Sequence, residues 1–186
     1  CLAPIRKNII KNPLSLVNYI DLLKCTIWFS VPSMLRYLMS MKGLNKKTFI
    51  NIRVVMFGGE GYPKKELIKL YSLYNDRINF FNVYGPTECT CICSTKKIED
   101  NDFVDLRGFP SMGKLNPNFS HFILDKNNQE SSEGELYLIG PNIGNGYYND
   151  RKRTSESFLD CGKKKHYGKK IYKTGDLVKQ LSLIHI

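Results

Sequence analysis

The spacing of apolar residues predicts alternating helices and strands in the first half of the chain. Apolar positions recur at helical spacing in three segments, residues 14–23, 34–39 and 67–71. Three short apolar runs are typical of buried strands, residues 26–31, 53–57 and 78–83. Pro32 and Pro63 stand where the second and third helices would begin, a position that proline tolerates. Strands separated by helices of this length predict right-handed β-α-β units and a mostly parallel sheet.

After residue 88 the pattern becomes mainly that of strands. Four segments have strand character and are separated by Gly, Asn and Pro turns, residues 91–98, 120–125, 135–139 and 171–178. One segment, residues 151–158, has helical spacing, and Asp150 before it is a candidate N-cap. We therefore expect an α/β subdomain over residues 1–88 and a β-rich subdomain over residues 89–180.

The composition is ordinary for a globular protein, with 42% hydrophobic and 24% charged residues. No apolar run approaches the roughly 20 residues that a membrane-spanning helix needs, so we expect no membrane span. The net charge of +11 leaves a basic nucleic-acid-binding protein open as an alternative of a different class. However, 21 of the 28 basic residues are Lys, although Arg makes the better bidentate contact to phosphate and guanine. We interpret the densest run, residues 163–170, as a solvated surface loop, and we expect no nucleic-acid partner.

Both ends of the chain suggest a piece of a longer protein. The chain starts at Cys1, with neither an initiator Met nor the pattern of a signal peptide. Residues 181–186, Leu-Ser-Leu-Ile-His-Ile, match the in-frame translation of a transposon end used in preparing sequencing libraries. We expect these six residues to be non-native.

The cysteines show no metal-binding or redox pattern. There are six of them, Cys1, Cys25, Cys89, Cys91, Cys93 and Cys161. No two form a C-x-x-C pair. The alternation of Cys89, Cys91 and Cys93 predicts that they share one face of a strand, where they would be small buried hydrophobes. Scattered thiols without a secretory signal indicate a reducing, cytoplasmic location.

The segment Phe81–Glu88 presents three polar side chains just beyond a buried strand. Tyr84 can stack on a planar base, and Thr87 can donate a hydrogen bond to a phosphate oxygen. Glu88 offers the hard oxygen ligand that suits Mg²⁺. Open α/β sheets bind ligands beyond the carboxyl ends of their strands, so a nucleotide site is a reasonable hypothesis. The structural alternative is an ordinary strand-to-loop turn.

Two further segments are weaker on their own. In residues 172–177 a Thr-Gly-Asp turn exposes Asp176, whose carboxylate can accept hydrogen bonds from two ribose hydroxyls. Such turns are common. The glycines of residues 134–148 match neither G-x-G-x-x-G nor G-x-x-x-x-G-K-[ST], so they are interpreted as β-turns and bulges.

Together, the order and spacing of the segments resemble the adenylate-forming (AMP-binding) superfamily. The segments that carry the resemblance are Phe57–Glu60, Asn82–Glu88, Gly134–Leu136 with Gly146-Tyr147, Thr154–Phe158 and Tyr172–Asp176. Over roughly residues 11–180 the chain is similar to adenylation domains of nonribosomal peptide synthetases and to D-alanine–carrier protein ligases. The resemblance implies part of the large N-terminal region of such an enzyme, an α/β sheet followed by a β-rich, distorted barrel-like subdomain.

The resemblance also implies an ATP site around Tyr84. Asn82 and Tyr84 would hold the adenine, and Asp176 would bind the ribose hydroxyls. Thr87 would contact the α-phosphate and Glu88 would ligate Mg²⁺, which makes these two the catalytic residues. The implied nucleotide-binding set is Gly59, Glu60, Asn82, Tyr84, Gly85, Thr87 and Asp176.

The implied reaction is the activation of an amino acid or another small carboxylic acid. A carboxylate oxygen attacks the α-phosphorus of ATP, giving an aminoacyl-AMP and pyrophosphate, and the acyl group passes to a phosphopantetheine thiol on a carrier protein. The implied acid pocket consists of Ser30, Met56, Gly58, Val83, Cys91 and Ile92. An acyl-CoA synthetase-type AMP-forming ligase remains the alternative enzyme, and a non-catalytic relative is a third interpretation.

Other parts of the family pattern are expected outside this sequence. The phosphate loop and the aspartate that pairs with a substrate amino group would precede residue 1. The hinge and the catalytic lysine would follow residue 180. We therefore expect this polypeptide alone not to form acyl-AMP.

Overall fold

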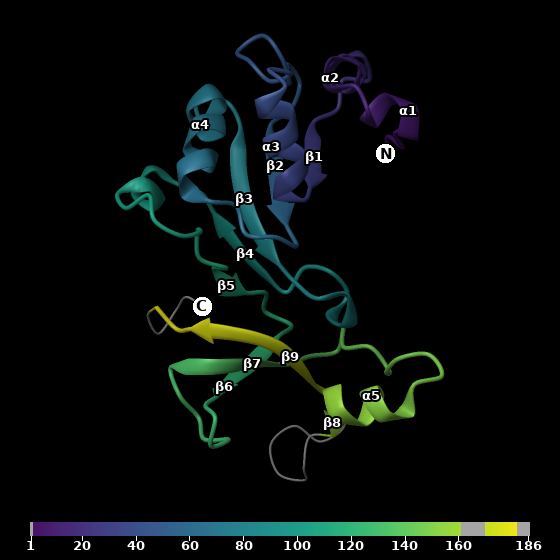
Figure 1. Cartoon of the computed structure of the whole chain (residues 1–186), viewed down its shortest axis with the longest axis vertical. Helices are drawn as coiled ribbons and strands as arrows, with labels where there is room; N and C mark the ends of the chain where they lie inside the picture. The colour runs from purple at the N-terminus through teal and green to yellow at the C-terminus, as the bar shows by residue number, and fades with distance from the viewer. Residues whose placement is uncertain (1, 161–169, 182–186) are drawn as a thin grey trace. The chain divides into compact units, whose positions relative to one another are not determined.

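The computed structural model describes residues 2–160 and 170–181. They fall into two compact units. The first unit consists of the chain up to Asn82 together with Lys97–Pro110. The second consists of Val83–Lys96 and the chain from Ser111 onward. Figure 1 shows the order of the elements along the chain.

The first unit alternates strands and helices, as the apolar spacing predicts. Its strands are β1 (Ile27–Ser30), β2 (Val54–Gly58) and most of β3 (Asn79–Tyr84). Its helices are α1 (Lys7–Ile10), α2 (Pro13–Leu22), α3 (Pro32–Ser40) and α4 (Lys64–Tyr74), with a 3₁₀ turn η2 (Asp100–Phe103). β1 and β2 are parallel, with Ser30 opposite Phe57. The predicted helices and strands of this half are therefore confirmed.

The core of the first unit is built from large side chains of these elements. Five aromatic residues are the largest fully buried side chains, Phe49, Phe57, Tyr62, Tyr74 and Phe80. Burial of such rings supplies most of the stabilisation of a small unit. Pro32 begins α3, as expected. Pro63 is the N-cap residue of α4, one position before the first helical residue, and Pro13 also begins a helix, α2.

Two sheets organise the strands. The first has the order β1-β2-β3-β4-β5, in which β4 (Ser94–Lys97) and β5 (Lys114–Leu115) are antiparallel. Among the described strands β1 is at the end of this order, and Ile27 and Phe29 on it are 53% and 54% exposed. The fold is thus mixed α/β, which confirms the predicted class.

The second sheet lies wholly in the second unit. It consists of β6 (Ser120–Leu124), β7 (Glu133–Ile139), β8 (Phe158–Asp160) and β9 (Lys170–Lys179), in the order β6-β7-β9-β8 (Figure 1). All three neighbouring pairs are antiparallel. Because β6 and β8 end the order, the described strands form an open sheet and no closed barrel. The barrel-like expectation is corrected to this extent.

The predicted helix of the second unit is α5 (Arg151–Ser157). The carboxylate of Asp150 accepts a hydrogen bond from the backbone N–H of Arg153 at 3.0 Å, so the predicted N-cap is confirmed. The core of this unit includes Leu136, Leu138 and the thiols of Cys89 and Cys93.

One predicted strand begins later than expected. Residues 91–93 lie outside β4, because Thr90 and Cys91 adopt left-handed conformations with φ of 60° and 75°. A chain in that conformation cannot continue a β-ladder. The three alternating cysteines therefore do not share a strand face. Cys89 and Cys93 are buried, as small hydrophobes would be, but Cys91 is exposed.

Some expectations fall outside the described residues. Residues 163–169 of the basic run 163–170, Cys161, and residues 182–186 of the expected non-native segment are among them. No helix in the described part of the chain is long and apolar enough to cross a membrane. The predicted subdomain boundary at residue 88 stays a prediction.

Candidate functional site

The turn that follows β3 is held by close backbone packing. At Gly85 a Cβ atom would lie 1.6 Å from the carbonyl oxygen of Cys91, so no side chain fits there. The backbone N–H of Cys93 donates a hydrogen bond to the carbonyl of Tyr84 at 2.8 Å. Thr87 then begins a three-residue 3₁₀ turn, η1 (Thr87–Cys89), with its side chain exposed. The turn thus presents Thr87 and Glu88 from a fixed backbone.

Tyr84 and Asp176 lie together although they are 92 residues apart in the sequence. The Tyr84 hydroxyl donates a hydrogen bond to Oδ2 of Asp176 at 2.5 Å. Burial raises the pKa of Tyr84, and the hydrogen bond to the Asp176 carboxylate raises it further. The phenol therefore stays protonated at neutral pH and can act as a donor. The structure brings together the residues predicted to hold the base and the ribose.

An irregularity in the sheet positions Asp176. Between β7 and β9, Glu135 is opposite Leu177 and Tyr137 is opposite Lys173, so β9 spans four residues where β7 spans two. The extra residues form a bulge around Gly175, which has a φ of +77°. The backbone N–H of Gly175 donates to a carboxylate oxygen of Glu135 at 3.1 Å. This bulge leaves the Asp176 side chain exposed at the sheet surface.

Glu88 lies against a tyrosine of the second unit. The Tyr147 hydroxyl donates a hydrogen bond to Oε1 of Glu88 at 2.7 Å. Burial on its own would raise the pKa of the Glu88 carboxyl. Hydrogen bonds from Tyr147, from the backbone and from Tyr172 outweigh burial, and the nearby charge of Arg153 adds to them, so the pKa lies below its ordinary value. Glu88 is therefore ionised at neutral pH.

This environment fits a magnesium ion held mainly by phosphates. Mg²⁺ is commonly bound by one or two protein carboxylates together with phosphate oxygens and water. An ionised, half-buried Glu88 beside the exposed Thr87 hydroxyl supplies one such carboxylate. Within residues 2–160 and 170–181, no group of three or more His, Cys, Asp or Glu side chains could enclose a metal without other ligands. The donor set agrees with a metal that arrives with a nucleotide.

The other predicted nucleotide residues belong to the first unit. Gly59 has a φ of +84°, which favours glycine. The Glu60 carboxylate accepts hydrogen bonds from the backbone N–H and the hydroxyl of Ser33, both at 3.1 Å, so it caps the first turn of α3. The side-chain amide of Asn82 donates to the carbonyl of Pro110 at 3.5 Å. The described contacts thus give Glu60 a structural role that sequence reasoning missed.

Three residues of the predicted acid pocket lie on two neighbouring strands. Ser30 ends β1 and Gly58 ends β2, while Met56 lies in the middle of β2, opposite Phe29. Because β1 and β2 are parallel, their carboxyl ends meet at the same edge of the sheet. The Ser30 hydroxyl accepts a hydrogen bond from the indole N–H of Trp28 at 2.8 Å. These three residues therefore form a neighbouring set.

The remaining three pocket residues belong to the second unit. Val83 is buried in β3, Cys91 is exposed in the left-handed turn, and Ile92 is half-buried. The carbonyl of Ile92 accepts a hydrogen bond from the side-chain amide of Asn116 at 3.0 Å. Their assignment to an acid pocket stays a prediction.

Comparison with known families decides the relationship of the chain. Residues 2–148 match the family described as AMP-binding enzyme. The chain belongs to this family. A D-alanine–D-alanyl carrier protein ligase of Listeria monocytogenes is 27% identical over 179 residues, which are 94% of this chain and 34% of the relative. Malpibaldin synthetase of Mortierella alpina is 33% identical over 159 residues, 84% of this chain and 3% of the relative.

Solved structures show the same fold as this AMP-binding chain. PA1221, a nonribosomal peptide synthetase protein containing adenylation and carrier domains, has a TM-score of 0.77 at 23% identity, over 96% of this chain and 34% of its own. The adenylation domain AlmE of Vibrio cholerae, solved with glycyl-adenosine-5'-phosphate, has a TM-score of 0.74 at 22% identity, over 93% and 33%. The AMP-binding chain spans about a third of the length of the D-alanine ligases that it matches.

Proposed function

We propose that this chain is part of an amino-acid adenylating ligase. The enzyme uses ATP and Mg²⁺ to convert a carboxylate into an aminoacyl-AMP and pyrophosphate, and then transfers the acyl group to a carrier-protein phosphopantetheine thiol. The observation that carries the proposal is the hydrogen bond between Tyr84 and Asp176, which joins the predicted base site to the predicted ribose site. The similarity over 94% of the chain to ligases named for D-alanine and a carrier protein supports the substrate class.

The nucleotide sits along the side chains that surround the turn after β3. A base stacked on the Tyr84 ring places its ribose near the carboxylate that the Tyr84 hydroxyl contacts, because base and sugar are directly linked. Asp176 accepts hydrogen bonds from the ribose hydroxyls. In the first unit, Gly59, Glu60 and Asn82 remain the adenine contacts predicted from the resemblance. In the second unit, Gly85 lets the turn pack closely.

Catalysis in this proposal is alignment and neutralisation of charge. The Thr87 hydroxyl donates a hydrogen bond to an α-phosphate oxygen, and the ionised carboxylate of Glu88 holds the metal. Mg²⁺, when bound, neutralises charge on the phosphate that is attacked. The neighbouring set Ser30, Met56 and Gly58 holds the first unit's predicted contacts to the acid. The reaction itself needs the acid carboxylate aligned with the α-phosphorus. The cytoplasmic location remains part of this proposal.

Amino-acid-dependent exchange of labelled pyrophosphate into ATP tests the proposal. The protein is the product of the complete reading frame that contains this chain. We expect exchange with one or a few small amino acids and none with fatty acids. Exchange that depends on fatty acids, with acyl transfer to coenzyme A, would support the acyl-CoA synthetase alternative instead. The proposal would be refuted if none of the acids supported exchange and the protein did not bind ATP.

A single substitution tests the ribose contact. Asp176→Asn removes the negative charge of the side chain that accepts hydrogen bonds from the ribose hydroxyls. Because hydrogen bonds to charged groups contribute about 1.5–3 kcal/mol, we expect ATP to bind at least about tenfold more weakly. Asp160→Asn, an exposed carboxylate on β8 of the same sheet, is the matched control. Equal ATP affinities of the two variants in equilibrium dialysis would contradict the assignment.

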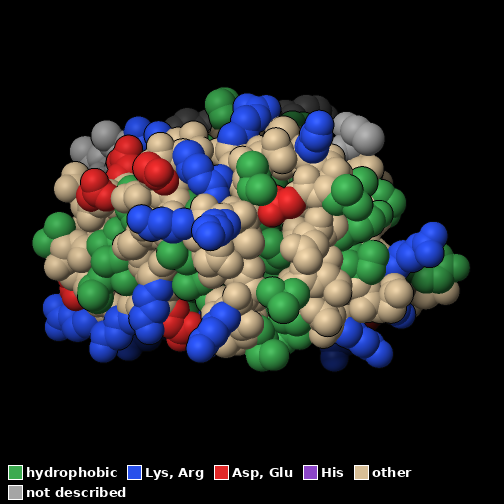
Figure 2. All heavy atoms as spheres, turned by 90° about the horizontal axis from the view of Figure 1, so that it is seen from above, with side chains coloured by type: hydrophobic (Ala, Val, Ile, Leu, Met, Phe, Trp, Pro, Cys, Tyr) green, Lys and Arg blue, Asp and Glu red, His purple; other side chains and the backbone are tan. Residues whose placement is uncertain are grey.

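The predominance of Lys, 21 of the 28 basic residues, gives the nucleic-acid alternative little support, because Arg makes the better bidentate contact. Figure 2 shows described Lys and Arg side chains on one face, with acidic and hydrophobic side chains among them. A protein that tracks a nucleic-acid backbone presents a continuous basic stripe. Tight, strongly salt-dependent binding of DNA or RNA would restore this alternative.

A further inference from the structure

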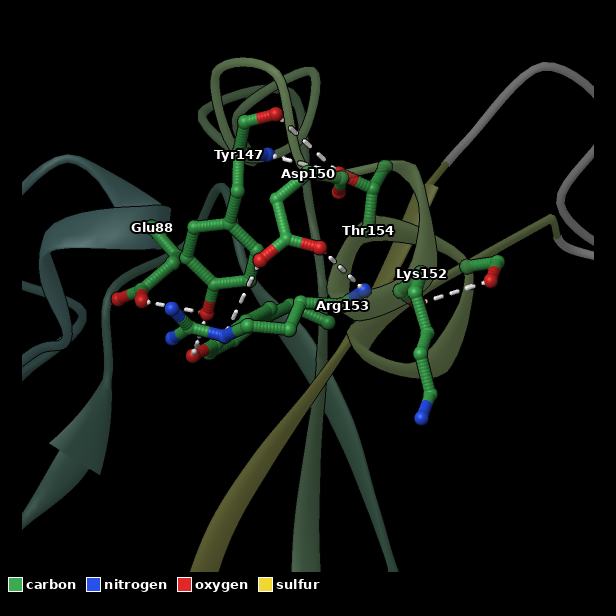
Figure 3. A network of polar contacts seen from close by, with 8 residues as sticks. Glu88, Tyr147, Asp150, Lys152, Arg153 and Thr154 are labelled. Carbon is green, nitrogen blue, oxygen red and sulfur yellow. Dashed lines mark hydrogen bonds and ion pairs between the residues drawn. The ribbon is translucent and has the colours of Figure 1, made fainter.

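Two sequence segments without an assigned role meet at Tyr147, which contacts Glu88. The first contains Gly146 and Tyr147, and the second is Thr154–Phe158. Tyr147 donates its hydroxyl to Oε1 of Glu88 at 2.7 Å, across 59 positions of sequence. Figure 3 shows the Glu88 carboxylate at the hydroxyl end of the Tyr147 ring. The side chain predicted to hold the metal is therefore contacted by a residue from another part of the second unit.

The backbone of Tyr147 is fixed by the helix that follows it. Its N–H donates a hydrogen bond to Oγ1 of Thr154, in α5, at 2.9 Å. Gly146 has a φ of +134°, and a Cβ there would lie 2.4 Å from a methyl carbon of Thr154. Only glycine combines that conformation with so close an approach. The Gly146 and Thr154 pair therefore sets the direction in which Tyr147 leaves the backbone.

The ring of Tyr147 is fixed on two sides. The guanidinium of Arg153 lies over the ring, 4.4 Å from its centre (Figure 3). Phe158 packs edge-on against the ring, with centres 5.4 Å apart and an angle of 77° between the planes. Asp150 balances the Arg153 charge at 4.0 Å. These contacts hold the ring so that its hydroxyl oxygen lies beside the Glu88 carboxylate, with the Tyr172 hydroxyl at 3.5 Å.

The same part of the chain also holds the backbone of Glu88. The N–H of Gly144 donates a hydrogen bond to the Glu88 carbonyl at 2.7 Å. Without these contacts Glu88 would stand on a three-residue 3₁₀ turn followed by the left-handed Thr90 and Cys91, which is a short and strained support. Residues 144–158 therefore brace both the main chain and the carboxylate of Glu88.

We propose that Tyr147 is a positioning residue that orients the Glu88 carboxylate for a divalent metal, and that Arg153 holds the Tyr147 ring in place. The inference rests on the proposed function of Glu88. A hydrogen-bond donor behind a ligating carboxylate fixes which lone pairs face the metal, and loss of such a partner typically lowers metal affinity about 10–100-fold. In this proposal Tyr147 acts only through the Glu88 carboxylate.

Manganese binding tests the inference without reliance on turnover. The product of the complete reading frame is titrated with Mn²⁺ in the presence of a saturating non-hydrolysable ATP analogue, and the free ion is followed by electron paramagnetic resonance. We expect Tyr147→Phe, which keeps the ring and loses the hydroxyl, to weaken Mn²⁺ binding at least tenfold. The affinity for the analogue measured without metal is expected to change less than twofold. Tyr148→Phe is the matched control, since Tyr148 is adjacent and 94% exposed.

A double-mutant cycle separates positioning from general loosening of the fold. In a Glu88→Gln background, Tyr147→Phe is expected to have no further effect on Mn²⁺ binding, because its action passes through the carboxylate. Arg153→Met, which keeps the hydroxyl but removes the cation over the ring, is expected to weaken Mn²⁺ binding about twofold to fivefold. This variant keeps the test decisive if Tyr147→Phe does not fold.

The outcomes distinguish the inference from the function on which it rests. If Glu88→Gln loses Mn²⁺ binding while Tyr147→Phe and Arg153→Met bind it like Tyr148→Phe, the positioning role is overturned and the proposed function stands. If Tyr147→Phe weakens Mn²⁺ binding equally with and without the Glu88 carboxylate, the role is merely structural and the inference is also overturned. If Glu88→Gln itself binds Mn²⁺ normally, the metal assignment fails, and the inference fails with it.

Discussion

The substitution Gly85→Ala tests whether the turn after β3 requires a bare backbone. A Cβ at this position would lie 1.6 Å from the oxygen and 2.5 Å from the carbon of the Cys91 carbonyl, and 2.8 Å from the nitrogen of Cys93. All three are backbone atoms, so no side chain can rotate away. For the added Cβ to lie about 3.0 Å from the nearest atom, Gly85 and the Cys91 carbonyl must move apart by about 1.4 Å.

The energetic cost follows from that displacement. It would break the hydrogen bond from the N–H of Cys93 to the carbonyl of Tyr84, now 2.8 Å long. Loss of one such bond costs about 1 kcal/mol, and forced overpacking costs about 1–3 kcal/mol. We therefore expect Gly85→Ala to lower the free energy of unfolding by about 2–4 kcal/mol. Because Thr87 and Glu88 leave the same turn, we also expect weaker binding of ATP.

Urea unfolding followed by circular dichroism measures the loss. Gly108→Ala is the matched control, because Gly108 has a φ of +67° but no neighbouring atom within 4 Å of the place that a methyl group would occupy. It should cost only backbone strain, about 1 kcal/mol. If Gly85→Ala costs no more than Gly108→Ala, the close approach of the Cys91 carbonyl does not constrain the turn, and the steric reasoning is refuted.

Three further predictions concern single side chains. Burial and the Asp176 carboxylate raise the pKa of Tyr84 above its ordinary value of 10.0, so the stability that its hydroxyl contributes is present below pH 10 and is lost as the pH rises above it. Between pH 10 and higher pH, Tyr84→Phe should therefore lose less unfolding free energy than the unsubstituted protein. An equal loss in the two proteins would contradict this prediction. Glu60→Gln removes a negative charge from the first turn of α3 and should cost about 0.5 kcal/mol in thermal unfolding at low salt, an effect that high salt should erase. Asp150→Ala removes the N-cap of α5 and should cost about 1 kcal/mol in urea unfolding, whereas Asp150→Asn, which also caps, should remain close to the unsubstituted protein.

Most regular elements could be predicted from the sequence because apolar periodicity and turn residues agree there. The helices opened by Pro13 and Pro32, and the helix capped by Asp150, carry their start signals in the sequence itself. The shortest elements carry no such signal: α1 has four residues and β5 has two, so neither is long enough for a hydrophobic pattern to repeat. Such elements depend on tertiary contacts.

The predicted start of β4, at residue 91, was wrong for a different reason. Thr90 and Cys91 both have positive φ, a conformation that residues other than glycine disfavour and that a β-branched residue such as Thr disfavours most. The alternating cysteines therefore look like a strand in the sequence. The turn depends on tertiary contacts, such as the close approach of the Cys91 carbonyl to Gly85 and the hydrogen bond from the N–H of Cys93 to the Tyr84 carbonyl.

The sequence names residues for the candidate site but not the connections between them. The sequence places Tyr84, Glu88 and Asp176 in motifs, and the structure joins Tyr84 to Asp176. The link from Glu88 to Tyr147 has no sequence signal, because the glycines of residues 134–148 mark turns and do not show where a tyrosine between them points. Likewise, the bulge that exposes Asp176 depends on the register of two strands, which is a property of the sheet.

The open side of β1 has a practical consequence for handling this polypeptide. Within the described sheet no strand pairs with that side, and Ile27 and Phe29 are about half exposed on it. An unpaired strand with apolar side chains is a template on which other copies can add, so concentrated solutions of the 186-residue chain should aggregate through it. Phe29→Lys should discourage that addition, so at equal concentration the variant should scatter less light than the unsubstituted chain.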